Sequence, residues 1–150
     1  MERDLVKTPD FLVIGGGIIG TAVARELKRR YCDALIVVLD KESSGHAHGS
    51  GRNSGVLHAG FYYTAESHKA AFTRRGNQML TEYCLQRGLA LNACGKLVVT
   101  RSESELEALD ELYRRGQINA VPLEMLSEAE ASEIEPRAKT VGRALFSPTT

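Results

Sequence analysis

The chain has 150 residues, of which 43% are hydrophobic and 25% are charged, a composition typical of a globular protein and not of a disordered one. Its nineteen basic and nineteen acidic side chains cancel, so charge gives no indication of nucleic-acid binding. Cys32, Cys84 and Cys94 form no C-x-x-C pair, which argues against a zinc site or a disulfide framework, and we expect reduced, partly buried thiols.

Residues 10–40 predict a strand, a helix and a second strand joined by a right-handed crossover. The helix is expected from about Ile18 to Arg30, before an apolar run from Ala34 to Leu39. Ile19, Val23 and Leu27 recur at helical spacing, so they are expected to pack against the sheet.

A G-x-G-x-x-G fingerprint lies between this strand and this helix, at Gly15, Gly17 and Gly20. Asp40 ends the second strand twenty residues later, where an acid can accept hydrogen bonds from ribose hydroxyls. The setting predicts a dinucleotide whose phosphates lie at the helix start. The alternative is a surface turn that binds nothing, and a Walker loop is excluded because Gly-Lys-Ser/Thr is missing.

The remaining chain predicts a long loop followed by alternating helices and strands. A helix is expected from Ser67 to Arg87, closed by Gly88, with apolar positions inward. These inward positions include Ala71, Met79 and Tyr83. Short strands are predicted at 97–100, 121–125 and 144–146. Capping boxes at 102–105 and 127–130 predict two further helices, the first reaching about residue 115.

Two features argue against a metal site and against a membrane-embedded or exported chain. His46 and His48 lie in a Gly/Ser-rich loop without a carboxylate cluster, so no metal site is predicted. The first ten residues contain no hydrophobic signal core, and the longest wholly apolar run spans only residues 34–39. We expect a cytoplasmic protein, with peripheral attachment to the inner membrane left open.

The segment from Ser50 to Tyr63 combines small residues with Arg, Asn, Ser and His side chains. Together with the glycine fingerprint, it resembles the amino-terminal part of FAD-dependent oxidoreductases of the D-amino-acid oxidase superfamily. Within that superfamily, the chain most resembles the L-2-hydroxyglutarate dehydrogenase (oxidase) family. The likeness covers essentially the whole chain, and four later motifs agree with it: Ser67–Ala70, Cys94–Val98, Glu135–Pro136 and Ala144–Thr150.

The resemblance implies an α/β fold, with a Rossmann-like FAD-binding βαβ unit and the start of an interleaved α+β substrate domain. Residues 1–87 would belong to the FAD domain and residues 88–150 to the substrate domain. Family members more often carry Glu where this chain has Asp40, a conservative difference. The implied cofactor-binding residues are Gly15, Gly17, Ile18, Ile19, Gly20, Asp40, Lys41, Ser50, Arg52, Asn53 and Ser54. For Arg52, an anion contact and a surface position are both open.

The resemblance also implies His58 as the catalytic residue. In the related glycerol-3-phosphate dehydrogenases a similar histidine segment lies at the substrate site. The implied reaction is oxidation of a 2-hydroxy acid, L-2-hydroxyglutarate to 2-oxoglutarate, with hydride transfer to flavin N5 and a histidine as the base. The alternative for His58 is a histidine that only hydrogen-bonds the loop backbone. The electron acceptor, whether oxygen, a quinone or a carrier, is left open.

Other functions stay open at this point. They are oxidation of glycerol 3-phosphate, an amino acid or an amine by another member of the superfamily, NAD-dependent chemistry, and an inactive nucleotide-binding remnant. Relatives are much longer, with carboxyl-terminal segments that complete the FAD domain and the substrate pocket. We therefore expect an amino-terminal fragment that, alone, binds FAD poorly and turns over little substrate.

Overall fold

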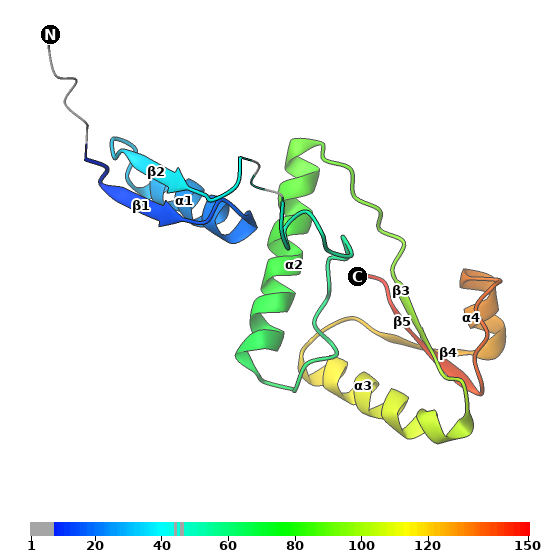
Figure 1. The fold of residues 1–150 in the computed structure, drawn as a ribbon. Coiled ribbons are helices and arrows are strands. Elements are labelled where there is room, and N and C mark those ends of the chain that lie inside the picture. The colour runs from blue at the N-terminus through cyan, green and yellow to red at the C-terminus, as the bar shows by residue number, and fades with distance from the viewer. Residues whose placement is uncertain (1–7, 44, 46) are drawn as a thin grey trace, which may run out of the picture. The chain divides into compact units, whose positions relative to one another are not determined.

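The computed structural model describes residues 8–43, 45 and 47–150. The chain divides into two compact units, Met1–Gly55 and Val56–Thr150, and mixes helices and strands as expected of an α/β fold (Figure 1). The domain division expected after residue 87 concerns the complete domains of the relatives and stays a prediction.

The first unit is the predicted strand, helix and strand. β1 (Phe11–Ile14) and β2 (Ile36–Leu39) pair in parallel, and α1 (Ile18–Arg30) connects them (Figure 1). The Lys28 ammonium donates to the carbonyl of Ala34 at 2.9 Å, which ties the end of the helix to the chain entering β2. This arrangement confirms the βαβ unit that the glycine fingerprint predicts.

The apolar side chains on one face of α1, which include Ile19 and Val23, are more exposed to solvent than their helical spacing predicts. Ile19 is 76% exposed and Val23 is 46% exposed, so the expectation that both pack against the sheet is wrong. A helix with its side chains is about 10–12 Å wide, whereas two paired strands lie only about 5 Å apart. The two-stranded sheet is therefore too narrow to bury these side chains.

The second unit begins with a loop and α2 (His68–Arg87). Ser67 Oγ accepts the amide of Ala70 at 3.1 Å, and Gly88 ends the helix at a φ of 62°, which confirms both predicted ends. Ala71 and Met79 are exposed, in contrast to the prediction.

The buried face of α2 instead carries Ala70 and Asn77. Gly60 lies against this face, where a Cβ would approach the carbonyl oxygen of Ala70 to 3.3 Å. The helix packs against the loop before it, which an apolar pattern cannot predict.

An antiparallel sheet with the strand order β3-β5-β4 forms the centre of this unit. Leu145 of the central strand packs with Leu109, whereas the neighbouring Ala144 packs with Ala131. Successive strand residues point to opposite faces, so α3 and α4 cover opposite faces of the sheet. The elements are β3 (Lys96–Val99), the 3-10 turn η1 (Glu103–Glu105), α3 (Leu106–Ile118), β4 (Glu124–Ser127), α4 (Glu128–Ile134) and β5 (Arg143–Ser147) (Figure 1).

The two predicted capping boxes have different outcomes. Ser127 Oγ accepts the Glu130 amide at 3.3 Å, and the Glu130 carboxylate accepts the Ser127 amide at 2.8 Å, which confirms the box. The box at Ser102 is wrong, because Ser102 makes no side-chain cap. The Glu105 carboxylate accepts the amide and the guanidinium of Arg101 instead.

Two further expectations concern thiols and membrane spans. Cys32, Cys84 and Cys94 are free, but Cys32 and Cys94 are exposed and not partly buried as expected. Among the residues that the structure describes, no helix has the length and apolar character needed to cross a bilayer.

Candidate functional site

The glycine turn joins the end of β1 to the start of α1. Gly15 has a φ of 104°, and its amide donates to the carbonyl of Leu39 at 2.7 Å, so the chain leaves the sheet in a conformation that other residues rarely adopt. A Cβ on Gly20 would lie 1.8 Å from the Gly15 carbonyl oxygen. Only glycine at both positions lets the first helical turn lie this close to the strand.

The amides at the start of α1 are partly available. The amide of Ile18 donates to Ser50 Oγ at 2.8 Å. The amides of Ile19 and Gly20 have no acceptor within the described part of the chain, and no acidic residue stands in the first helical turn. This helix end therefore offers unpaired donors and a positive dipole end to an anion.

Asp40 is directed at the glycine turn from the end of β2. Its carboxylate accepts the amide of Gly16 at 2.5 Å and the amide of Glu42 at 2.8 Å. Donation by the Glu42 amide, and next by the Gly16 amide, holds the pKa of the Asp40 carboxyl below its usual value. Each carboxylate oxygen retains a further lone pair, so the group can accept other hydrogen bonds.

The loop residues predicted to bind the cofactor have different surroundings. Asn53 Nδ2 donates to the carbonyls of Gly49 and Ser50 at 3.2 and 3.0 Å, and its Oδ1 accepts the amide of Gly55 at 2.8 Å. Asn53 thus folds the loop and presents little of its amide to a ligand. Arg52 is exposed.

A shallow depression of about 410 Å³ lies at the glycine turn. Ser50 and Gly17 both line it, and a Cβ on Gly17 would approach Ser50 Oγ to 3.1 Å. The lining residues come from β1, the turn, α1 and the loop: Val13, Ile14, Gly15, Gly17, Ile18, Ile19, Gly20, Val23 and Ser50. It therefore brings together the predicted glycines, Ile18, Ile19 and Ser50. Asp40, Lys41, Arg52, Asn53 and Ser54 do not line it.

Lys41 and His48 are exposed side chains near Asp40 in sequence, and both lie beside Glu42. Lys41 Nζ is 3.8 Å from Glu42 Oε1, which also lies 3.0 Å from His48 Nε2, and all three side chains are exposed. His46 lies outside the described residues. Within the described ranges, no three His, Cys, Asp or Glu side chains gather as metal ligands would.

His58 belongs to the second unit and is exposed. Its neighbours Ala59 and Phe61 are buried among core side chains, including Leu109. No residue in the described part of the chain hydrogen-bonds the imidazole, and the role of His58 stays a prediction.

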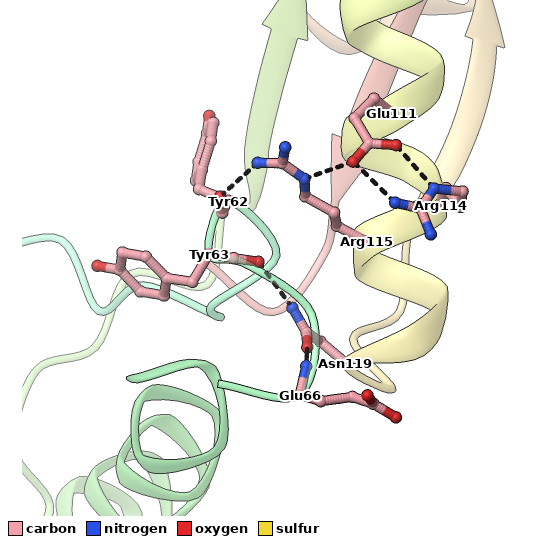
Figure 2. A network of polar contacts seen from close by, with 7 residues as sticks. All are labelled: Tyr62, Tyr63, Glu66, Glu111, Arg114, Arg115 and Asn119. Atoms are coloured by element: carbon pink, nitrogen blue, oxygen red, sulfur yellow. Dashed lines mark hydrogen bonds and ion pairs between the residues drawn. The ribbon is translucent and has the colours of Figure 1, made fainter. Parts of the chain in front are cut away.

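Three polar residues that the sequence analysis did not single out hold the segment around His58. Asn77 donates to the carbonyl of Leu57 at 2.9 Å, and Asn119 donates to the carbonyl of Tyr63 at 3.2 Å. Arg115 donates to the carbonyl of Tyr62 at 3.4 Å (Figure 2). Asparagine is a poor former of helix interiors, so its position inside α2 was the available signal.

Comparison with known proteins agrees with this geometry. The family model of the FAD dependent oxidoreductases matches residues 10–150. The chain is 43% identical over 141 residues to an L-2-hydroxyglutarate dehydrogenase of Escherichia coli strain UMN026, covering 94% of this chain and 33% of that protein. It is 41% identical over 128 residues to the mitochondrial L-2-hydroxyglutarate dehydrogenase of Homo sapiens, covering 85% and 28%.

The chain thus spans about a third of the length of these relatives. Among solved structures, glycine oxidase from Geobacillus kaustophilus superposes with a TM-score of 0.81 at 24% identity, covering 94% of this chain and 39% of that one, which supports the fold alone. Since the family model matches from Asp10 to the last residue, and the glycine turn stands in its setting, this chain belongs to the family of FAD-dependent oxidoreductases.

Proposed function

We propose that this protein oxidises L-2-hydroxyglutarate to 2-oxoglutarate with FAD as its cofactor. The observation that carries the proposal is the 43% identity over 94% of the chain to a protein of that activity. The glycine turn supplies independent support for the nucleotide, because its free amides and missing side chains suit a diphosphate.

The residues of the first unit fit the adenosine diphosphate half of FAD. We place the diphosphate at the amides of Ile19 and Gly20, with the positive end of the α1 dipole behind them. Ser50 Oγ already accepts the Ile18 amide, so its hydroxyl proton is free to be donated to a phosphate oxygen. Asp40 retains lone pairs for ribose hydroxyls, and the amides of Glu42 and Gly16 lower its pKa further below neutral pH.

His58 is proposed as the group that takes the substrate's hydroxyl proton. Histidine is the side chain most often used as a general base, and the His58 imidazole has no hydrogen-bond partner among the residues that the structure describes. Bound FAD supplies the acceptor for the hydride from the substrate's α-carbon. Arg52 is exposed and offers five fixed donors, which suits pairing with a phosphate or carboxylate.

Anaerobic mixing of the purified full-length flavoprotein with candidate substrates tests the proposal. We expect L-2-hydroxyglutarate to bleach the visible flavin absorbance and its D enantiomer to leave the absorbance unchanged. Glycerol 3-phosphate, glycine and sarcosine serve as the comparison panel. If one of these three compounds bleaches the flavin and L-2-hydroxyglutarate does not, the protein has a different substrate. If the purified protein is colourless and carries NAD, the proposal that FAD is its cofactor is wrong.

A further inference from the structure

The segment Leu57–Tyr63 is held in place by packing of the residues that follow His58. Ala59 is 3% exposed and Phe61 is 1% exposed, and both pack into the core with Leu109 of α3. Gly60 between them has a φ of 101° and lies against α2. The backbone after His58 is therefore fixed by burial, whereas the His58 side chain is exposed.

A side chain of α2 holds the backbone just before His58. Asn77 of α2 is only 8% exposed, and its Nδ2 donates to the carbonyl of Leu57 at 2.9 Å and to the carbonyl of Thr149 at 2.8 Å. An amide nitrogen has two protons, so both are used. The carbonyl of Leu57 belongs to the peptide group that continues into the His58 nitrogen, so Asn77 sets the orientation of that peptide plane.

The other end of the segment has separate anchors. The Glu111 carboxylate accepts a hydrogen bond from Arg115 Nε at 2.7 Å. The same guanidinium donates a second hydrogen bond to the carbonyl of Tyr62 at 3.4 Å (Figure 2). Asn119 accepts the Glu66 amide at 3.3 Å and donates to the carbonyl of Tyr63 (Figure 2). These contacts lie four, five and eight residues after His58, beyond the buried Ala59 and Phe61.

We propose that Asn77 is a positioning residue for His58, holding the Leu57 carbonyl so that the imidazole meets the substrate's hydroxyl at a fixed place. The inference rests on the proposed function of His58 as the base. Small displacements of a reacting group slow catalysis by about 100-fold, so a lost anchor next to the base lowers the rate of chemistry. The residues proposed to hold the FAD diphosphate and ribose lie in the first unit, so we expect the FAD content of an Asn77 variant to be unchanged.

The test compares Asn77→Leu with His58→Ala and with the double variant in the full-length holoenzyme. Leucine has nearly the same size and no donor. We expect Asn77→Leu to slow flavin reduction at saturating L-2-hydroxyglutarate by about 10- to 100-fold with little change in the substrate concentration at half-maximal rate. In the His58→Ala background, the same change should slow the reaction by less than about twofold, because the group it positions is gone.

Asn119→Ala is the matched control, because it removes an anchor of the same segment away from His58. It should lower thermal stability and leave the rate of flavin reduction within about twofold. Asn77→Ser retains one hydrogen-bond donor, so its rate of flavin reduction should lie between those of the unsubstituted enzyme and Asn77→Leu. This variant tests the proposal if Asn77→Leu does not fold.

Two results separate the possible failures. If the unsubstituted enzyme is not reduced by L-2-hydroxyglutarate, the proposed function fails. If it is reduced and His58→Ala is slow, but the Asn77 variants react normally or slow both backgrounds equally, Asn77 is only structural and the inference is overturned.

Discussion

At the scale of single residues, the accessibility of His58 leads to a kinetic prediction. General-base catalysis contributes about 100- to 10,000-fold to a rate, so His58→Ala should slow flavin reduction by that amount while FAD content stays unchanged. The measurement is rapid-mixing absorbance of the full-length enzyme. His68→Ala is the control, because His68 is also exposed and its imidazole stacks on Phe72. Equal rates for the two variants would remove His58 from the reaction.

Asp40 provides a prediction for pH dependence. Its pKa is lowered in the folded state by the amides of Glu42 and Gly16, so its contribution to stability is complete above the ordinary aspartate pKa of about 3.9 and is lost as the pH falls through the lowered value. Asp40→Asn should therefore lower the melting temperature of the apoprotein at pH 5–7, and the difference should shrink as the pH falls below the ordinary aspartate pKa of about 3.9.

The same substitution should weaken FAD binding at neutral pH, because an amide oxygen accepts fewer hydrogen bonds than a carboxylate. Asp33→Asn, at an exposed position after α1, controls for the loss of one negative charge. A melting difference that does not change with pH would show that the Asp40 carboxylate makes no charge-dependent contribution.

At the scale of elements, the two serines of the predicted capping boxes offer a matched pair. Ser127→Ala removes an N-cap worth about 1 kcal/mol, so exchange of the α4 amides should accelerate about fivefold. Ser102→Ala should leave exchange in α3 unchanged, because that hydroxyl bonds to Ser104 and caps no helix. Hydrogen exchange by mass spectrometry separates the two segments, and equal effects would contradict the assignment.

The elements most easily predicted are those that local chemistry specifies. Ser67 caps the start of α2 and Gly88 ends it, and α1 begins directly after Gly17 of the glycine fingerprint. β4 begins at Glu124 and not at Val121, since an apolar run does not distinguish a buried loop from a strand.

The contacts around the candidate site divide in the same way. The glycines of the turn follow from their spacing, because their role is local. The bond from Asn77 to Leu57 joins residues 20 positions apart, and its bond to Thr149 joins residues 72 positions apart. No local pattern encodes such pairs, so the sequence can mark Asn77 as an unusual residue inside a helix, but its partners are visible only in the fold.

At the scale of the whole molecule, the two units differ in how much of their apolar surface they bury. In Val56–Thr150, two clusters of buried side chains lie on the two faces of the sheet. In Met1–Gly55, no described residue is buried. Leu12, Ile14 and Leu39 share the sheet face away from α1, because parallel partners point to the same side, and Ile14 is 83% exposed.

This difference predicts how the 150-residue polypeptide behaves by itself. A parallel sheet is normally covered on both faces, and two strands with one helix are marginal alone, so the first unit should open readily. Amides of β1 and β2 should exchange within seconds, whereas those of α3 and β5 are protected for at least about a hundredfold longer. The polypeptide should also copurify with little FAD, because the helix start that would hold the diphosphate belongs to the opening unit. Equal protection of both units, or stoichiometric yellow flavin bleached by L-2-hydroxyglutarate, would mean that the βαβ unit is stable without a cover for Leu12, Ile14 and Leu39.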